Sequence, residues 1–205
     1  FYYITTMNEN YSLPAMPEGA AEGILKGMYQ LSAAQDQAAP HVQLLGCGSI
    51  LREVIAAAEL LKNDWGVSSD IWATPSLNEL TRDGQACERW NMLHPDQPPR
   101  RSWVAQCLEG AQGPVIASTD YMKLFAEQIR PFVPGDYHVL GTDGFGRSDS
   151  RPALRAHFEV DRHYVTLAAL KALLDQGAKG ITAATLQDAM KKYGIDPEKP
   201  NPLYA

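Results

Sequence analysis

The sequence predicts an α/β domain with a mainly parallel sheet. Short apolar runs that are typical of buried strands alternate along the chain with segments that place apolar side chains on one helical face. This alternation is typical of β-α units, which build parallel sheets. The 205 residues are 45% hydrophobic and 20% charged, which suits one globular domain with a core of its own.

The first half of the chain contains one clear β-α unit. Residues 42–45 form an apolar run typical of a buried strand, and residues 49–63 then show the amphipathic pattern of a helix. Residues 71–74 repeat the strand pattern. Residues 75–94 are mixed and less regular, and residues 94–102 contain three prolines, which is typical of a loop.

Two more strands are predicted in the second half, over residues 115–117 and 137–140. Ser118 or Thr119 is suited to cap a helix that follows the first of these strands. The apolar face of this helix would consist of Tyr121, Met122, Leu124, Phe125 and Ile129. A further β-α unit is therefore expected here.

Three helices are predicted near the end of the chain. They would cover residues 151–157, 163–176 and 182–193. Thr182 is suited to cap the last of them, because a threonine hydroxyl can accept a hydrogen bond from a backbone N–H of the first turn. Gly194 and Pro197 are typical of the positions that follow a helix.

The most informative segment is the glycine-rich loop that joins the strand at residues 137–140 to the next helix. Its glycines allow tight backbone geometry, and its acids and arginines project charge from the carboxyl end of a strand, where sites form in open α/β sheets. The residues predicted to make contacts are Asp143, Phe145, Gly146, Arg147, Asp149 and Arg151. A plain strand-to-helix turn, with Ser150 or Asp149 as N-cap, fits the same residues.

Charge and composition exclude several classes of function. The net charge of −6 disfavours nucleic-acid binding, which needs a dense basic surface. No apolar run approaches the roughly eighteen residues of a membrane span, so no membrane association is expected. The three cysteines have no C-x-x-C spacing, which disfavours a zinc site or a disulfide framework and favours reduced thiols in the cytoplasm.

The sequence shows no complete catalytic or cofactor-binding motif. Residues 46–51 follow a strand and open a helix, but Leu51 stands where a dinucleotide fingerprint has its third glycine. The five histidines are scattered without metal-binding spacing, and no Gly-x-Ser-x-Gly sequence occurs. We therefore assign no catalytic, cofactor-binding or metal-binding residue.

Several further runs of unusual composition are shared with one enzyme family. These runs are Tyr2 to Tyr11, Met16 to Gly19, Arg82 to Gln85, Cys87 to Asn91, Ser118 to Lys123 and Phe158 to Asp161. Together with the glycine-rich loop, they closely resemble the C-terminal region of the homodimeric bacterial pyruvate dehydrogenases, a thiamine-diphosphate-dependent family. The resemblance extends from Phe1 to Ala205.

This resemblance implies a fold and a domain division. The fold would be that of a transketolase C-terminal domain, an α/β structure with a mixed, mostly parallel five-stranded sheet flanked by helices. Residues 24–31, whose period fits either a strand or a helix, would form a strand at the sheet edge. Residues 1–20 would be a linker arm and the end of a preceding catalytic domain, and residues 21–205 the domain itself. The first residue is Phe rather than Met, which predicts that the chain begins inside a longer polypeptide.

The resemblance also implies an activity for the intact protein. Such an enzyme decarboxylates pyruvate on thiamine diphosphate with Mg²⁺ and reductively acetylates the lipoyl group of dihydrolipoyl acetyltransferase, as a cytoplasmic homodimer. The family holds its cofactor with a Gly-Asp-Gly segment and paired asparagines, whose oxygens suit a hard cation. This chain has only Thr142-Asp143-Gly144 and no asparagine pair downstream. The cofactor would therefore be bound by upstream domains, and this chain alone would be inactive.

Within such an enzyme, the chain would contact its partner subunit and the upstream catalytic domains. Besides the loop, the residues predicted to make these contacts are Arg82, Asp83, Arg89 and Trp90, which offer charge and aromatic area in an irregular region. A salt-bridged surface helix is the alternative for them. For the whole chain, the alternative is a non-enzymatic binding or regulatory module that docks the acyltransferase or a small anion. A free-standing α/β enzyme would need a catalytic set that the sequence lacks.

Overall fold

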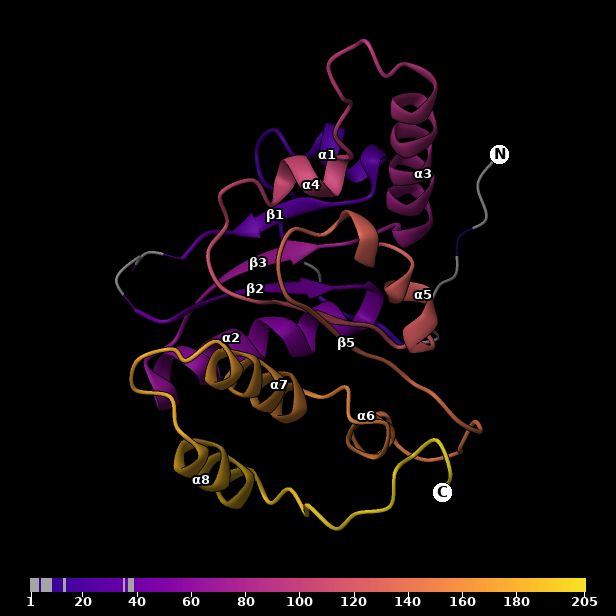
Figure 1. Cartoon of the computed structure of the whole chain (residues 1–205). Coiled ribbons are helices and arrows are strands. Elements are labelled where there is room, and N and C mark those ends of the chain that lie inside the picture. The colour runs from indigo at the N-terminus through magenta and orange to yellow at the C-terminus, as the bar shows by residue number, and fades with distance from the viewer. Residues whose placement is uncertain (1–3, 5–8, 13, 35, 37–38) are drawn as a thin grey trace.

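The computed structural model describes residues 4, 9–12, 14–34, 36 and 39–205. Five strands form one sheet in the order β1-β3-β2-β4-β5 (Figure 1). Strands β2 to β5 run parallel, and β1 pairs antiparallel with β3 at one edge. The predicted mixed, mostly parallel five-stranded sheet is confirmed. The strands are Tyr29–Ser32 (β1), His41–Gly46 (β2), Ser68–Ala73 (β3), Val115–Ser118 (β4) and Tyr137–Leu140 (β5).

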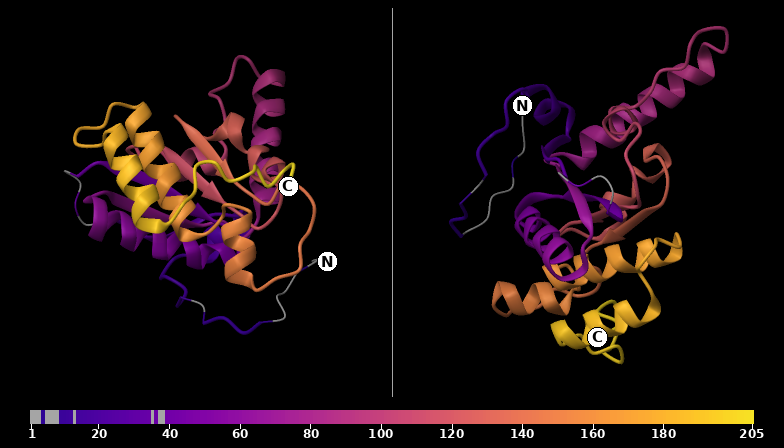
Figure 2. Two further views of the ribbon diagram at one scale, coloured as in Figure 1. Left: turned by 90° about the horizontal axis from the view of Figure 1, so that it is seen from below. Right: turned by 90° about the vertical axis from the view of Figure 1, so that its left-hand side faces the viewer.

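Helices flank the sheet on both faces (Figures 1 and 2). The α-helices are Ala21–Lys26 (α1), Leu51–Trp65 (α2), Leu77–Leu93 (α3), Trp103–Cys107 (α4), Lys123–Glu127 (α5), Arg151–His157 (α6), Arg162–Asp175 (α7) and Ala183–Tyr193 (α8). Short 3₁₀ helices cover Gly48–Ile50 and Arg130–Phe132. On one face α2 packs against α7, and α8 lies outside α7. On the other face lie α3, α4 and α5.

Two hydrophobic cores lie on opposite faces of the sheet. Because successive side chains of a strand point to opposite faces, Leu44 enters the core with α2 and α7, and Leu45 enters the core with α3, α4 and α5. All of β2 is buried. The strand is thus the centre of the fold, and packing from both faces fixes the loop at its carboxyl end.

The predicted edge strand over residues 24–31 is only partly correct. Its first three residues belong to α1, which ends at Gly27 with a left-handed φ of 96°. The strand begins only at Tyr29. A Cβ at Gly27 would lie 2.4 Å from the carbonyl oxygen of Ser76, so this turn needs a glycine both for its backbone angle and for close packing.

The prediction of an irregular stretch at residues 75–94 is wrong. It forms α3, whose N-terminus is capped by the Ser76 side chain, which accepts a hydrogen bond of 3.2 Å from the Glu79 backbone N–H. The buried residues of α3 all lie between Leu77 and Gly84, because the rest of the helix projects away from the sheet (Figure 2). The outer half of α3 has no buried residue, so it shows little of the apolar period that identifies a helix packed on a core.

The helix predicted after β4 is shorter than expected. Only five residues, Lys123–Glu127, are helical, and no side chain caps the helix. Ser118 belongs to β4, and the Thr119 hydroxyl accepts from the Tyr121 backbone N–H at 3.2 Å in a turn. Tyr121, Met122 and Leu124 are exposed. The expected apolar face is therefore largely a surface.

The last part of the chain agrees with the sequence pattern. The helix predicted at residues 151–157 is α6, and those predicted at 163–176 and 182–193 differ from α7 and α8 by one residue at their ends. Thr182 caps α8 and Gly194 ends it with a φ of 67°. Of the arm predicted at residues 1–20, residues 1–3, 5–8 and 13 lie outside the described residues.

We expect Thr182→Ala to lower the free energy of unfolding by about 1 kcal/mol, the usual cost of a lost N-cap. The Thr182 hydroxyl accepts from the Thr185 backbone N–H at 3.3 Å, and the Thr185 hydroxyl accepts from the Thr182 backbone N–H at 3.1 Å. Urea denaturation would measure the change. Thr182→Ser keeps the hydroxyl and should cost clearly less; equal losses for both variants would contradict the capping role.

Candidate functional site

The loops that follow β2, β4 and β5 meet at the carboxyl edge of the sheet. From β2 the chain continues to β3 on one side, whereas β4 lies on the other side, so this edge contains a topological switch point of the kind that forms sites in α/β proteins. The Ser49 hydroxyl donates to the Asp120 carboxylate at 3.1 Å, and the Thr142 hydroxyl donates to the Asp120 carbonyl at 2.7 Å. These bonds tie the three loops together.

The loop at residues 141–150 is held close to the body at its start and is exposed further on. A Cβ at Gly141 would lie 2.8 Å from backbone atoms of Tyr121 and Lys123. The Asp143 carboxylate accepts a hydrogen bond of 3.0 Å from the Lys123 backbone N–H. The Phe145 side chain, in contrast, is 82% exposed. Asp143 is thus occupied within the domain, and Phe145 is available for an external contact.

The end of the loop enters α6 without side-chain capping. Ser150 occupies the N-cap position but makes no side-chain cap bond. The Asp149 carboxylate instead accepts from the Ser150 backbone N–H at 2.6 Å. Gly146, Arg147 and Asp149 are exposed. The simple turn capped by Ser150 or Asp149 is therefore not what the structure shows, although Asp149 does bind the backbone at the helix entry.

Glu53 of α2 is the buried acid of the site, with 5% of its surface exposed. Arg155 of α6 donates to its carboxylate at 3.1 Å, and Arg162 at the start of α7 donates from both side chain and backbone, at 2.9 and 3.1 Å. Burial alone would raise the pKa of Glu53, but the hydrogen bonds and charge of Arg162, with the charge of Arg155, lower it overall. Glu53 therefore stays ionised and joins three helices.

Glu9 and Tyr11, near the start of the chain, contact the same cluster. Tyr11 lies beneath two guanidinium groups, with the ring centre 4.4 Å from Arg52 and 5.8 Å from Arg155. Arg155 also donates to the Tyr11 hydroxyl at 3.2 Å. Arg151, the first residue of α6, forms an ion pair with Glu9. Arg151, which the sequence predicts to contact other domains or the partner subunit, thus has an ion-pair partner within this chain.

Two cavities adjoin at this cluster. One encloses about 260 Å³ between the loop and the start of α6, and the other about 520 Å³ beside Tyr11 and Glu53. Arg151 and Arg155 line both. The cavities therefore form a continuous arginine-rich region at the carboxyl edge.

The other predicted contact residues lie elsewhere. Helix α3 contains Arg82, Asp83, Arg89 and Trp90. It packs on one face of the sheet, whereas Phe158 and Val160, which follow α6, pack into the core on the other face. The structure does not bring these four residues together with the loop. Their location on a surface helix agrees with the alternative interpretation, and the irregular region expected for them is not observed.

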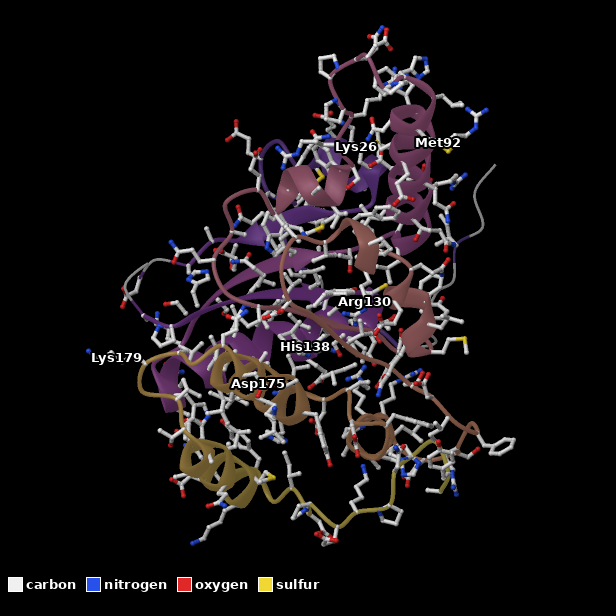
Figure 3. The ribbon with its side chains drawn as sticks, in the orientation of Figure 1. Lys26, Met92, Arg130, His138, Asp175 and Lys179 are labelled. Atoms are coloured by element: carbon white, nitrogen blue, oxygen red, sulfur yellow. The ribbon has the colours of Figure 1, made fainter. Side chains whose placement is uncertain are left out.

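Most of these α3 residues have partners within the domain. Arg82 pairs with Glu79 at 2.6 Å, and the Asp83 carboxylate accepts a hydrogen bond from the Trp103 backbone N–H. The Trp90 ring stacks on His94 with centroids 4.4 Å apart and lies 4.1 Å from the Arg100 guanidinium. Arg89 is exposed, and Figure 3 shows Met92 on the part of α3 that projects beyond the sheet.

No metal or nucleophile is assigned at the site. In the described part of the chain, no group of three His, Cys, Asp or Glu side chains is placed to hold a metal ion. Burial raises the pKa of Cys47 and of Cys107 to about 11, so both thiols are protonated at neutral pH. The described residues also include no helix long and apolar enough to cross a membrane.

A family model for the transketolase-like TK C-terminal domain matches residues 27–161, which include all five strands, the loop and α6. The chain belongs to the transketolase-like C-terminal domain family. The pyruvate dehydrogenase E1 component of Pseudomonas aeruginosa is 65% identical over 99% of this chain, and that of Escherichia coli K12 is 58% identical over the whole chain. In both cases the chain spans 23% of the relative's length.

Solved structures support the same fold for this transketolase-like C-terminal domain. A transketolase from Pichia stipitis superposes on 84% of the chain with a TM-score of 0.53 and 19% identity, and the match covers 22% of that protein. A transketolase from Campylobacter jejuni gives a TM-score of 0.50 over 72% of the chain at 16% identity, covering 19% of its own length. At these identities the likeness concerns the fold alone.

Proposed function

We propose that this chain is the C-terminal domain of a pyruvate dehydrogenase E1 component. The parent enzyme would be a cytoplasmic homodimer that decarboxylates pyruvate on thiamine diphosphate and Mg²⁺ and reductively acetylates the lipoyl group of dihydrolipoyl acetyltransferase. The observation that carries this proposal is the identity of 65% to 58% with proteins of that name over essentially the whole chain. Because the chain spans 23% of those proteins, the remaining machinery would lie in other domains.

The residues of this domain do not fit a thiamine diphosphate site. Mg²⁺ requires a set of oxygen ligands, but no group of three His, Cys, Asp or Glu side chains among the described residues is placed to hold a metal ion. Asp120 accepts from Ser49, and Asp143 accepts from the Lys123 backbone. The cofactor, which supplies an electron sink for decarboxylation, would be held by the upstream domains. We assign no step of that chemistry to this chain.

The role of the domain would be to make contacts between domains and between subunits. Exposed apolar side chains gather around the carboxyl edge: Tyr121 and Met122 precede α5, Leu124 lies on it, and Phe145 lies in the adjacent loop. Large exposed apolar side chains are typical of protein contact surfaces. The Glu53 cluster would hold α6 and the loop in position behind this surface.

The size of the natural polypeptide tests the domain assignment. Since this chain of 22.5 kDa spans 23% of its relatives, we expect a native product roughly four times as large, captured from its source with an antibody and measured by mass spectrometry. Peptides containing Gly-Asp-Gly and a downstream asparagine pair should accompany residues 1–205. A native product of 22.5 kDa would contradict the assignment.

Replacement of an exposed apolar residue tests the contact role. In the full-length protein, we expect Phe145→Ala to weaken subunit association at least fivefold by analytical ultracentrifugation, the effect typical of an interface residue worth over about 1 kcal/mol. Thermal unfolding of this domain should not change, because the Phe145 side chain is exposed. Leu25→Ala is the matched control, since Leu25 is exposed on α1. Unchanged association for Phe145→Ala would contradict the role of that residue.

A further inference from the structure

We propose that the cavity between the loop at residues 141–150 and the start of α6 binds a small organic anion that joins a phosphate or carboxylate group to an apolar body. The cavity encloses about 260 Å³, just below the roughly 300–1,000 Å³ of pockets for drug-sized ligands, so it suits a small ligand. It opens at the switch point between β2 and β4. The inference does not depend on the pyruvate dehydrogenase assignment.

The charge of the lining favours an anion. Arg151 and Arg155 lie one turn apart on α6, and Arg147 comes from the loop. Asp120 is the acidic residue among the lining side chains, so three guanidinium groups and one carboxylate line the cavity. Glu53 and Glu9 pair with Arg155 and Arg151 from outside it. Guanidinium groups bind carboxylates and phosphates through paired, charge-assisted hydrogen bonds.

Two of the three cations are held in place by groups outside this cavity. Arg155 donates to Glu53 and to the Tyr11 hydroxyl, and Arg151 forms an ion pair with Glu9. None of these partners lines the 260 Å³ cavity. Side chains that are ordered before binding lose little conformational entropy when a ligand arrives.

Arg147 differs from the other two arginines. It is exposed on the loop, and in the described part of the chain no acidic side chain forms a salt bridge with it. Gly146 beside it has open space where a Cβ would lie, so the rim of the cavity is accessible at this point. Arg147 is thus the cation best placed to engage an incoming anion.

Part of the cavity wall is apolar. Ile50, Leu154, Phe158 and Val160 line it. Sites for small molecules commonly combine an apolar wall with a few polar groups that fix the orientation of the ligand. An inorganic ion would leave this wall exposed to water, so an anion with an attached hydrocarbon or aromatic group should bind more tightly than the ion alone.

Calorimetric titration of the full-length protein with phenyl phosphate tests the proposal. The titration is made with thiamine diphosphate and Mg²⁺ in excess, so that any cofactor phosphate site of the parent protein is filled. We expect phenyl phosphate to bind more tightly than inorganic phosphate, and benzyl alcohol not to bind. Benzoate is titrated in parallel, and the tighter of the two aromatic anions identifies phosphate or carboxylate as the preferred group.

Variants of the lining separate the charged and apolar contributions. Arg147→Gln should weaken phenyl phosphate binding at least tenfold, the effect of a lost charge-assisted contact. Leu154→Ala should weaken phenyl phosphate binding but leave inorganic phosphate unchanged. Arg89→Gln, an exposed arginine on α3, is the matched control and should bind as the parent does.

Three results would overturn the anion site. They are the absence of binding by either aromatic anion, equal binding by Arg147→Gln and the unmodified protein, and equal binding of benzyl alcohol and phenyl phosphate. None of them affects the domain assignment, which the mass of the native polypeptide tests separately. If the native product is only 22.5 kDa, the same titration with that product still tests the anion site.

Discussion

Replacement of Glu53 by glutamine is expected to lower the free energy of unfolding by about 3 kcal/mol, the lower end of the range for breaking a buried ion pair. The carboxylate is 5% exposed and binds Arg155 and Arg162. Glutamine keeps the shape of the side chain but removes its charge, so two guanidinium groups lose their common anion. The loss of stability should lie at the lower end of that range, because the Arg162 side chain is 45% exposed and stays partly solvated without the carboxylate.

Urea denaturation followed by circular dichroism would measure this loss. Glu59→Gln is the matched control, because Glu59 lies on the same helix with an exposed side chain. We expect the control to change stability by less than about 0.5 kcal/mol, as is usual for surface positions. A similar small change for Glu53→Gln would show that the cluster does not hold α2, α6 and α7 together.

The same carboxylate predicts how stability depends on pH. The folded pKa of Glu53 is lowered from 4.5, since the hydrogen bonds and charges of Arg162 and Arg155 outweigh the effect of burial. A group with a lowered folded pKa stabilises the protein above its unfolded pKa and loses that contribution as the pH falls through the folded value. Stability should therefore decline below about pH 4.5, and Glu53→Gln should show a weaker decline. Parallel pH curves for both proteins would contradict this role.

Replacement of Gly144 by alanine is expected to lower the free energy of unfolding by about 2 kcal/mol, the cost of forcing a side chain into strained backbone geometry. Gly144 has a φ of 104°, and a Cβ there would lie 2.5 Å from the Pro202 carbonyl oxygen. The loop and the C-terminal tail therefore pack together through a glycine. Alanine should separate the two segments.

Hydrogen exchange of the tail would detect this separation. The Tyr204 backbone N–H donates to the Asn201 carbonyl at 2.9 Å, and we expect this amide to exchange faster in Gly144→Ala. Gly146→Ala is the control, because a Cβ at Gly146 meets nothing within 4 Å and its φ is not positive. If both variants exchange alike, the tail does not depend on close approach at Gly144.

The fold was predictable wherever the pattern of side chains was local. The strand at β5 and the helices α6 to α8 follow from apolar runs, caps and terminal glycines that lie next to one another in the chain. The length of α3 was not predictable in this way, because its outer half has no core to face. The resemblance supplied the mixed sheet with its antiparallel edge, which periodicity alone cannot distinguish from a fully parallel one.

The site was predictable only in part. The glycine-rich loop stands out in the sequence, and its exposed Phe145 and Arg147 agree with a surface for contacts. Glu53 does not stand out, because its partners lie over one hundred residues away and a charged residue within an amphipathic helix is expected to face solvent. Glu53 lies four residues before Ala57, which is buried on the same helix, but this spacing indicates a buried acid only once the partner helices are known.

Assay of the natural full-length protein for pyruvate decarboxylation is the most direct measurement of the proposed function. We expect release of carbon dioxide from pyruvate that requires thiamine diphosphate and Mg²⁺ and that acetylates an added lipoyl domain. The isolated 205-residue chain should release none, because no group of acidic, histidine or cysteine side chains among its described residues is placed to hold the metal of the cofactor. Full-length protein that binds thiamine diphosphate but leaves pyruvate unchanged would contradict the assignment to a pyruvate dehydrogenase.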